Sequence, residues 1–174
     1  MEIGIVGLGR MGANIARRLM RDGHTCVVYD VSPEVTAALG EEGATPASDL
    51  ADLASKLTAP RAVWVMVPAG EITETTPPNA GDVLEPGDAV TDGGNSSYRD
   101  DLRLAAKLAE SGIDHIDCGT SGGVFGLERG YCLMIGGPEE AYKRLEPIFE
   151  TLAPGVGEAE RTPGLTGDPS PAEK

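Results

Sequence analysis

The chain has 174 residues, 40% of them hydrophobic and 24% charged, and its formal net charge is −14. This length suits one domain with a sizeable core and is short for two. The negative charge argues against nucleic acid or an anionic membrane as a partner. Acidic residues outnumber basic ones by 28 to 14. Such a composition fits a source that lives at high salt, although some mesophilic chains look similar.

The three cysteines Cys26, Cys118 and Cys132 are odd in number and lack C-x-x-C spacing. They are predicted to be small buried hydrophobic residues in a reducing compartment. No charged leader precedes the first apolar run, and nothing approaches the roughly 18 consecutive apolar residues of a membrane span. The expectation is a cytoplasmic protein without a membrane partner.

The chain begins with a strand–helix–strand pattern. The apolar run 2–6 predicts a buried strand, and residues 10–22 predict a helix with one apolar face. Residues 25–29 predict a second strand, which is closed by Asp30. A second helix is expected to begin after Ser32, which can cap it ahead of a proline.

The middle of the chain continues this alternation. Residues 47–57 predict a helix, the apolar run 62–67 predicts a third buried strand, and residues 88–92 predict a fourth strand. A crossover helix is expected over 71–87, but two adjacent prolines there predict that it is broken. Residues 96–111 have a serine cap, early acids and a glycine beyond the end, and they predict a long helix.

The last predicted elements are strands at 113–119 and 131–137 and a helix at 138–152. Strands that alternate with helices predict an α/β fold of the Rossmann type, with a doubly wound and mostly parallel sheet, over residues 1–155. Residues 156–174 are rich in Gly, Pro and charge without apolar periodicity, and they are expected to be a linker or a disordered tail. A linker at this position suggests a truncated chain.

A G-x-G-x-x-G pattern directly follows the first predicted strand. Gly7 would make the tight turn, Gly9 would admit a pyrophosphate, and Gly12 would let helix and strand pack closely. The phosphates would rest on the free N–H groups at the start of the next helix. A purely structural turn is the alternative. The candidate cofactor-binding residues of this segment are Gly7, Leu8, Gly9, Arg10, Met11 and Gly12.

Asp30 lies 18 positions after Gly12, at the end of the second predicted strand. Its carboxylate can accept hydrogen bonds from the adenosine ribose hydroxyls and would repel a 2′-phosphate. The next two residues are Val31 and Ser32, so no arginine is there to receive that phosphate. The sequence therefore favours NAD over NADP. A solvated strand-end carboxylate is the alternative.

Two further glycine-rich loops follow predicted strands. The segment DGGNSSYRD (92–100) places Asn95 where it could contact substrate or nicotinamide, or where it could be part of a capped turn. The segment GTSGGVFGLERG (119–130) could form an anion-binding concavity or a flexible loop. His24 and His115 lie away from the carboxyl ends of the strands and are expected to be structural.

Taken together, these segments resemble the decarboxylating 6-phosphogluconate dehydrogenases, a branch of the β-hydroxyacid dehydrogenases. The resemblance rests on GLGRMGANIARRL (7–19), VMVPAG (65–70), DGGNSSYRDD (92–101) and GTSGGVFGLERGYCLMIGG (119–137). It covers about residues 1–155 and is closest to the shorter, often NAD-preferring members. It implies oxidation of 6-phosphogluconate at C3 by hydride transfer, followed by loss of CO2 to give ribulose 5-phosphate.

The resemblance also implies roles for individual residues. The loop 7–12 and Asp30 would bind the dinucleotide, and Val67, Pro68 and Ala69 would line its path toward the nicotinamide. Asn95 would touch both cofactor and sugar acid, and the substrate would be held by Ser121, Gly122 and Gly123. No metal ligand is implied.

The sequence departs from the family pattern in two ways. Longer members have acidic residues after S-G-G, whereas this chain has Val124 and Phe125. The family's general base is a lysine in a K-x-x-x-N motif beyond the dinucleotide domain, and none of the lysines here begins such a motif. The helical domain that completes the sugar pocket and forms the homo-oligomer is also missing. Because proton abstraction needs a base within reach, we expect cofactor binding with little or no turnover.

Two alternatives remain open at this point. A 3-hydroxyisobutyrate dehydrogenase-type enzyme shares the fold and the S-G-G loop, although N-S-S after D-G-G and the segment LERGY favour the sugar-acid enzyme. A dinucleotide-binding module without catalysis is the second alternative, and the Gly/Pro-rich tail would be its discriminating feature.

Overall fold

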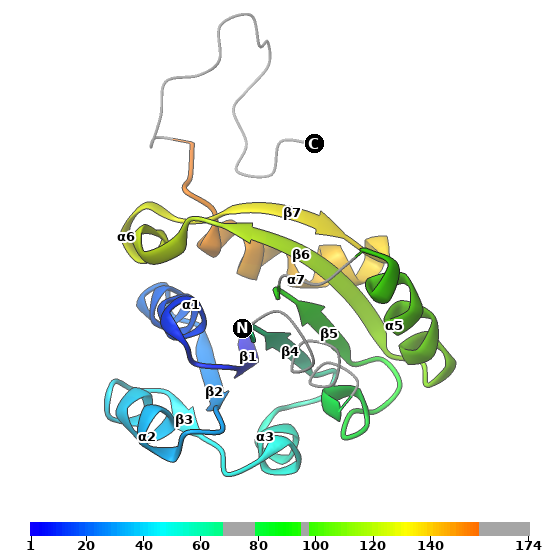
Figure 1. Ribbon diagram of the computed structural model, residues 1–174, viewed down its shortest axis with the longest axis horizontal. Coiled ribbons are helices and arrows are strands. Elements are labelled where there is room, and N and C mark those ends of the chain that lie inside the picture. The colour runs from blue at the N-terminus through cyan, green and yellow to red at the C-terminus, as the bar shows by residue number, and fades with distance from the viewer. Residues whose placement is uncertain (68–78, 95–97, 157–174) are drawn as a thin grey trace, which may run out of the picture.

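The computed structural model describes residues 1–67, 79–94 and 98–156 (Figure 1). Its strands are β1 (Glu2–Val6), β2 (Thr25–Tyr29), β3 (Thr45–Pro46), β4 (Ala62–Val65), β5 (Ala89–Asp92), β6 (Asp114–Ser121) and β7 (Cys132–Gly136). Its helices are α1 (Arg10–Arg21), α2 (Pro33–Glu41), α3 (Leu50–Lys56), α5 (Tyr98–Glu110), the 3₁₀ turn η1 (Gly123–Phe125), α6 (Gly126–Arg129) and α7 (Glu139–Leu152). Residues 79–81 are helical as well.

The strands form one sheet in the order β3-β2-β1-β4-β5-β6-β7. The first six run parallel, and β7 lies antiparallel to β6. The chain leaves β1 toward β2 on one side and later returns to β4 on the other. The sheet therefore reverses its winding between β1 and β4, and ligands of such sheets bind outside the carboxyl ends of the strands at this point. The predicted doubly wound α/β fold is confirmed.

Alternate residues of each buried strand point to opposite faces of the sheet and pack into two separate cores. Ile3, Ile5 and Trp64 belong to the core that α1 and α7 cover. Val63 and Val65 belong to the core that α3 and α5 cover. The period of two in the strands and the apolar stripes on the helices thus produce three layers. Within the described residues, no helix is long and apolar enough to cross a membrane.

Several predicted boundaries were wrong in informative ways. The two-residue strand β3 was not predicted, because a pair of exposed residues carries no periodicity. The third helix begins at Leu50 instead of residue 47, since Asp49 accepts the N–H of Asp52 and caps it. Strand β6 runs on to Ser121. Of the predicted broken helix 71–87, residues 71–78 lie outside the described residues, as does the tail from 157 onward.

The cysteine prediction was correct for two residues and wrong for the third. Cys26 and Cys118 are buried, and burial raises the pKa of each thiol to about 12. Cys132 is exposed. It starts the edge strand β7, whose burial alternates along the strand, so its side chain points away from the face that α7 covers.

Candidate dinucleotide site

The three glycines of the turn after β1 differ in the space that surrounds each of them. Gly7 has a φ of +88°, and a Cβ there would collide with the carbonyl oxygen of Met66. A Cβ on Gly12 would collide with the carbonyl oxygen of Gly7. A Cβ on Gly9, by contrast, would meet no atom of the described residues within 4 Å. Gly7 and Gly12 are therefore required by the protein's own packing, whereas Gly9 faces open space of the kind that a pyrophosphate needs.

Helix α1 starts with backbone donors that no described side chain caps. Its N-cap is Gly9, no side chain caps the helix, and no acid lies in the first turn. The N–H groups of Arg10, Met11 and Gly12 belong to this first turn, where an α-helix offers no internal acceptor. The exposed Arg10 adds a positive charge beside them. These donors and this charge fit a diphosphate, which is the binding mode that the glycine pattern predicts.

Asp30 joins the glycine turn to the end of β2. Its Oδ2 accepts the N–H of Leu8 at 2.6 Å, and its Oδ1 accepts the N–H of Ser32 at 2.9 Å. Each carboxylate oxygen can accept a second hydrogen bond. The half-buried carboxylate thus fixes the loop and keeps capacity for two ribose hydroxyls. The side chain of Leu8 is buried in the core, so only its backbone serves the site.

The carboxyl ends of three parallel strands meet next to this turn. Val6 lies opposite Val65, and Val65 lies opposite Asp92. The half-buried Val67 follows β4 and contributes to the core that α3 and α5 cover. The other predicted residues at this edge, Pro68, Ala69 and Asn95, lie outside the described residues.

Asp92 is a residue that the sequence reasoning passed over. It ends β5, is 1% exposed, and accepts the N–H of Gly94 at 2.8 Å through Oδ1. Its carboxylate therefore holds the start of the D-G-G loop that leads toward Asn95. An acid that ends a buried strand before two glycines was the available signal. Asp30, which follows β2, likewise accepts the N–H group two residues further on.

The predicted substrate loop follows β6. Ser121 is exposed at the end of that strand, and Gly122 and Gly123 have φ values of +152° and +52°. The next residues form η1 and α6, so a helical turn stands where an irregular loop was one of the alternatives. Ser121 pairs with Cys132 across β6 and β7, and paired residues of an antiparallel ladder share one face. The exposed thiol is thus a neighbour of the loop that the sequence analysis did not identify.

The lysines and histidines of the described residues lie elsewhere. Lys56 bonds to Asp52 and Lys143 to Glu140, each within its own helix. Lys107 lies in the last turn of α5. His24 contacts the N-terminal amine and Thr151, and burial lowers its pKa. None of these side chains is placed to abstract a proton at the crevice.

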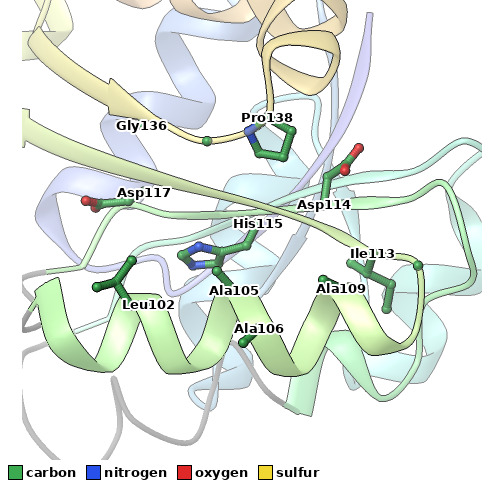
Figure 2. A pocket seen from close by; sticks show the side chains of 12 residues that line it. Leu102, Ala105, Ala106, Ala109, Ile113, Asp114, His115, Asp117, Gly136 and Pro138 are labelled. Atoms are coloured by element: carbon green, nitrogen blue, oxygen red, sulfur yellow. The ribbon is translucent and has the colours of Figure 1, made fainter.

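A hollow of about 730 Å³ lies between α5 and the strands β6 and β7 (Figure 2). It is lined by Leu102, alanines of α5 and, on the sheet side, His115 and Asp117. The His115 ring lies between β6 and α5 (Figure 2). The lining residues Asp114 and His115 are at the amino end of β6, so this hollow is separate from the edge where the glycine turn and the S-G-G loop lie.

Residues 2–159 match the family described as the NAD binding domain of 6-phosphogluconate dehydrogenase. The NAD(+)-dependent, decarboxylating 6-phosphogluconate dehydrogenase of Haloferax volcanii is 41% identical over 155 residues, which are 89% of this chain and 51% of that protein. The enzyme of the same name from Bacillus subtilis is 35% identical over 161 residues, 90% of this chain and 34% of that protein.

Solved structures agree with this match. Plasmodium falciparum 6-phosphogluconate dehydrogenase superposes with a TM-score of 0.83 at 27% identity, over 91% of this chain and 35% of that one. Mycobacterium tuberculosis 3-hydroxyisobutyrate dehydrogenase gives 0.79 at 25% identity, over 87% and 52%. The chain thus spans about half or less of the length of these relatives. Its family is nevertheless clear from the fold, the glycine turn and the matched residues: the chain belongs to the NAD-binding domains of the 6-phosphogluconate dehydrogenases.

Proposed function

We propose that this chain is the NAD-binding part of an oxidoreductase that oxidatively decarboxylates 6-phosphogluconate to ribulose 5-phosphate. The observation that carries the proposal is the open space at Gly9, bounded by uncapped N–H groups of α1 and by the Asp30 carboxylate. Protein atoms close off Gly7 and Gly12, so among the three glycines of this turn the described residues leave room at Gly9, the one where a pyrophosphate approaches. When bound, the nicotinamide accepts the hydride of the oxidation.

The preference for NAD rests on Asp30. Its two oxygens already accept backbone N–H groups, which hold the carboxylate in place. A 2′-phosphate on the ribose would bring a second negative charge to this carboxylate. The exposed side chain of Val31 has no donor to offer this phosphate. Both effects favour a free 2′-hydroxyl and therefore NAD.

Titration calorimetry with NAD and NADP tests this preference. The unchanged chain should bind NAD more tightly, and Asp30→Asn should narrow the difference, because it removes the charge and keeps one acceptor. Glu41→Gln, which removes a charge from an exposed position on α2, is the matched control and should leave the difference unchanged. Equal affinities of the unchanged chain for the two cofactors would refute the role of Asp30.

The assignment of 6-phosphogluconate rests on the S-G-G loop and on the relatives that carry that name. Ser121 and the backbone N–H groups after it would hold the acid, and the D-G-G loop would bring Asn95 toward it. The chain has no K-x-x-x-N segment and no described lysine at the crevice, so the C3 hydroxyl lacks its base. We therefore expect 6-phosphogluconate and NAD to give no NADH with this chain alone. Steady formation of NADH would contradict that expectation.

A second candidate is a 3-hydroxyisobutyrate dehydrogenase-type function. It is favoured by the similarity to the Mycobacterium tuberculosis enzyme and by Val124 and Phe125, which supply no charge after S-G-G. The two candidates differ in the ligand that the cofactor-loaded chain retains. Binding of 3-hydroxyisobutyrate without binding of 6-phosphogluconate would decide for the second candidate. Binding of NAD with neither acid would favour a dinucleotide module without catalysis.

A further inference from the structure

Arg18 on helix α1 connects three separate elements through backbone carbonyls. Its guanidinium donates to Leu127 O at 3.2 Å and Glu128 O at 3.4 Å in α6. It also donates to Thr151 O at 2.8 Å and Ala153 O at 2.9 Å, at the end of α7. These carbonyls lie in α6 and at the end of α7, where helical carbonyls lack internal partners. One planar cation with five donors can serve them together.

The residue that follows α6 and Gly130, Tyr131, packs directly beneath the S-G-G segment. Tyr131 is fully buried, and its ring is the nearest side chain to the positions that a Cβ would take on Gly122 and Gly126. The N–H of Tyr131 donates to Leu152 O at 2.7 Å, so the loop also rests on α7. Figure 1 shows α6 beside α1, as the contacts of Arg18 require.

Helix α1 therefore carries two functions at its two ends. Its first turn offers the N–H groups for the dinucleotide. Arg18, more than one turn further on, donates hydrogen bonds to the segment that follows Ser121–Gly123. Arg17, the neighbour of Arg18, pairs instead with Glu42 beyond α2 at 2.6 Å. Arg21 pairs with the exposed side chain of Glu128 at 2.9 Å. Among these three arginines, Arg18 makes the backbone contacts.

We propose that Arg18 is a positioning residue that couples the dinucleotide turn to the substrate loop, so that a cofactor bound at α1 fixes the S-G-G segment for the sugar acid. This proposal rests on the proposed function. Arg18 touches neither ligand, and it acts through the carbonyls of α6 and the packing of Tyr131 under the loop.

Amide hydrogen exchange of the chain, with and without NAD, tests the coupling. In the unchanged chain NAD should slow exchange both at residues 7–12 and at residues 121–131. Arg18→Met keeps the aliphatic stem and removes the donors, and residues 121–131 should then exchange about tenfold faster. NAD should still protect residues 7–12 of this variant but no longer residues 121–131. Arg17→Met is the matched control and should behave like the unchanged chain.

The outcomes separate the coupling from the function on which it rests. Protection of residues 7–12 alone in the unchanged chain would overturn the coupling, as would unaltered exchange of residues 121–131 in Arg18→Met. If NAD slows amide exchange nowhere in the unchanged chain, the proposed function is refuted. The comparison of exchange rates between the unchanged chain and Arg18→Met without NAD would still test whether Arg18 holds residues 121–131 in place. If Arg18→Met fails to fold by circular dichroism, Arg18→Lys replaces it. The lysine keeps the charge but cannot reach both helix ends, so it should also lose the protection of residues 121–131.

Discussion

Gly9 and Gly12 are three residues apart, yet an added methyl group should have different effects at the two positions: it should lower the stability of the fold at Gly12 and weaken NAD binding at Gly9. A Cβ on Gly12 would collide with the carbonyl oxygen of Gly7, so Gly12→Ala should destabilise the fold by about 1–3 kcal/mol. A Cβ on Gly9 would meet no atom in the part of the chain that the structure describes, and the φ of −59° suits alanine. Gly9→Ala should therefore fold normally and weaken NAD binding at least about tenfold. Thermal unfolding and titration calorimetry measure both effects.

The pair of variants serves as its own control. Loss of NAD binding in Gly12→Ala alone would be explained by the damaged turn and would say nothing of the ligand. Loss in Gly9→Ala with an unchanged melting temperature assigns the open space to the dinucleotide. Full affinity of Gly9→Ala for NAD would contradict the site.

Asp30 shows how the structure sharpens a residue identified from sequence. From spacing alone it was a ribose acceptor, and truncation to alanine would have been the natural test. Its hydrogen bonds to the N–H groups of Leu8 and Ser32 show that truncation would also release the glycine turn. We therefore expect Asp30→Ala to weaken both NAD and NADP. Asp30→Asn removes the charge and keeps one of the two acceptors, so it should disturb the glycine turn less than alanine does, although its N–H₂ group would face one of the two N–H donors.

At the scale of elements, Asp88 fastens the starts of β4 and β5 together. It is 1% exposed, and it accepts the N–H of Glu85 and both the N–H and the guanidinium of Arg61. Burial alone would raise the pKa of this carboxyl, but these hydrogen bonds outweigh burial and the net pKa is lowered. Asp88→Asn should reduce the free energy of unfolding at neutral pH by about 2–4 kcal/mol, because an amide N–H₂ would face other donors.

The lowered pKa of Asp88 also fixes the sign of a pH effect. Its folded pKa lies below the value of about 3.9 for an unfolded aspartate, so its contribution is complete above that value. The contribution is lost as the pH falls through the folded pKa. The difference between the unchanged chain and Asp88→Asn in urea unfolding should therefore shrink below about pH 4. Glu85→Gln is the control. Because Glu85 is an exposed partner of Arg61, its replacement should lower the free energy of unfolding by less than about 1 kcal/mol.

Strand β7 is an edge that the described residues leave open on one side. Its other side pairs with β6, its residues 132–136 carry no charge, and its central Met134 is 67% exposed. An open edge strand presents unpaired N–H and C=O groups that can pair with another chain, and charged residues, which hinder such pairing, are absent from β7. We expect concentration-dependent association that Met134→Lys reduces, as measured by sedimentation velocity. Leu102→Lys on α5 is the control, since Leu102 is 66% exposed but lies off the edge. Equal effects of the two lysines would point to general hydrophobicity instead.

Sequence periodicity predicted these elements to different degrees. Strand β4 is a continuous apolar run, β1 and β2 are mostly apolar, and such runs are well marked in a parallel sheet. Strand β5 has the mixed sequence AVTD, although all four of its residues are buried. The direction of β7 could not be predicted, because it depends on the compact turn that α6 forms and on the packing of the Tyr131 side chain beneath that turn. The glycine turn was predicted because its chemistry is local. The contacts of Arg18 span more than 100 residues of sequence, so no local pattern could show them.

At the scale of the whole molecule, the net charge of −14 sets the response to salt. Ion pairs such as Arg17–Glu42 and Lys143–Glu139 weaken in salt, but each exposed pair contributes at most about 1 kcal/mol. Acids outnumber basic residues by 28 to 14, so the larger effect is repulsion among the unpaired acids. Raising KCl from about 0.01 to 1 M shortens the screening length from about 30 to 3 Å. The melting temperature should therefore rise.

A variant with less charge distinguishes screening from a general effect of salt on apolar burial. Four exposed acids, Glu41, Asp82, Glu110 and Glu150, can be changed to their amides, which brings the net charge from −14 to −10. If repulsion dominates, the variant should melt higher than the unchanged chain in dilute buffer, and its melting temperature should rise less with KCl. Salting-out of apolar surface would act alike on both chains, because their cores are the same. Parallel dependences on KCl would therefore contradict the electrostatic explanation, whereas convergence at high salt would confirm it.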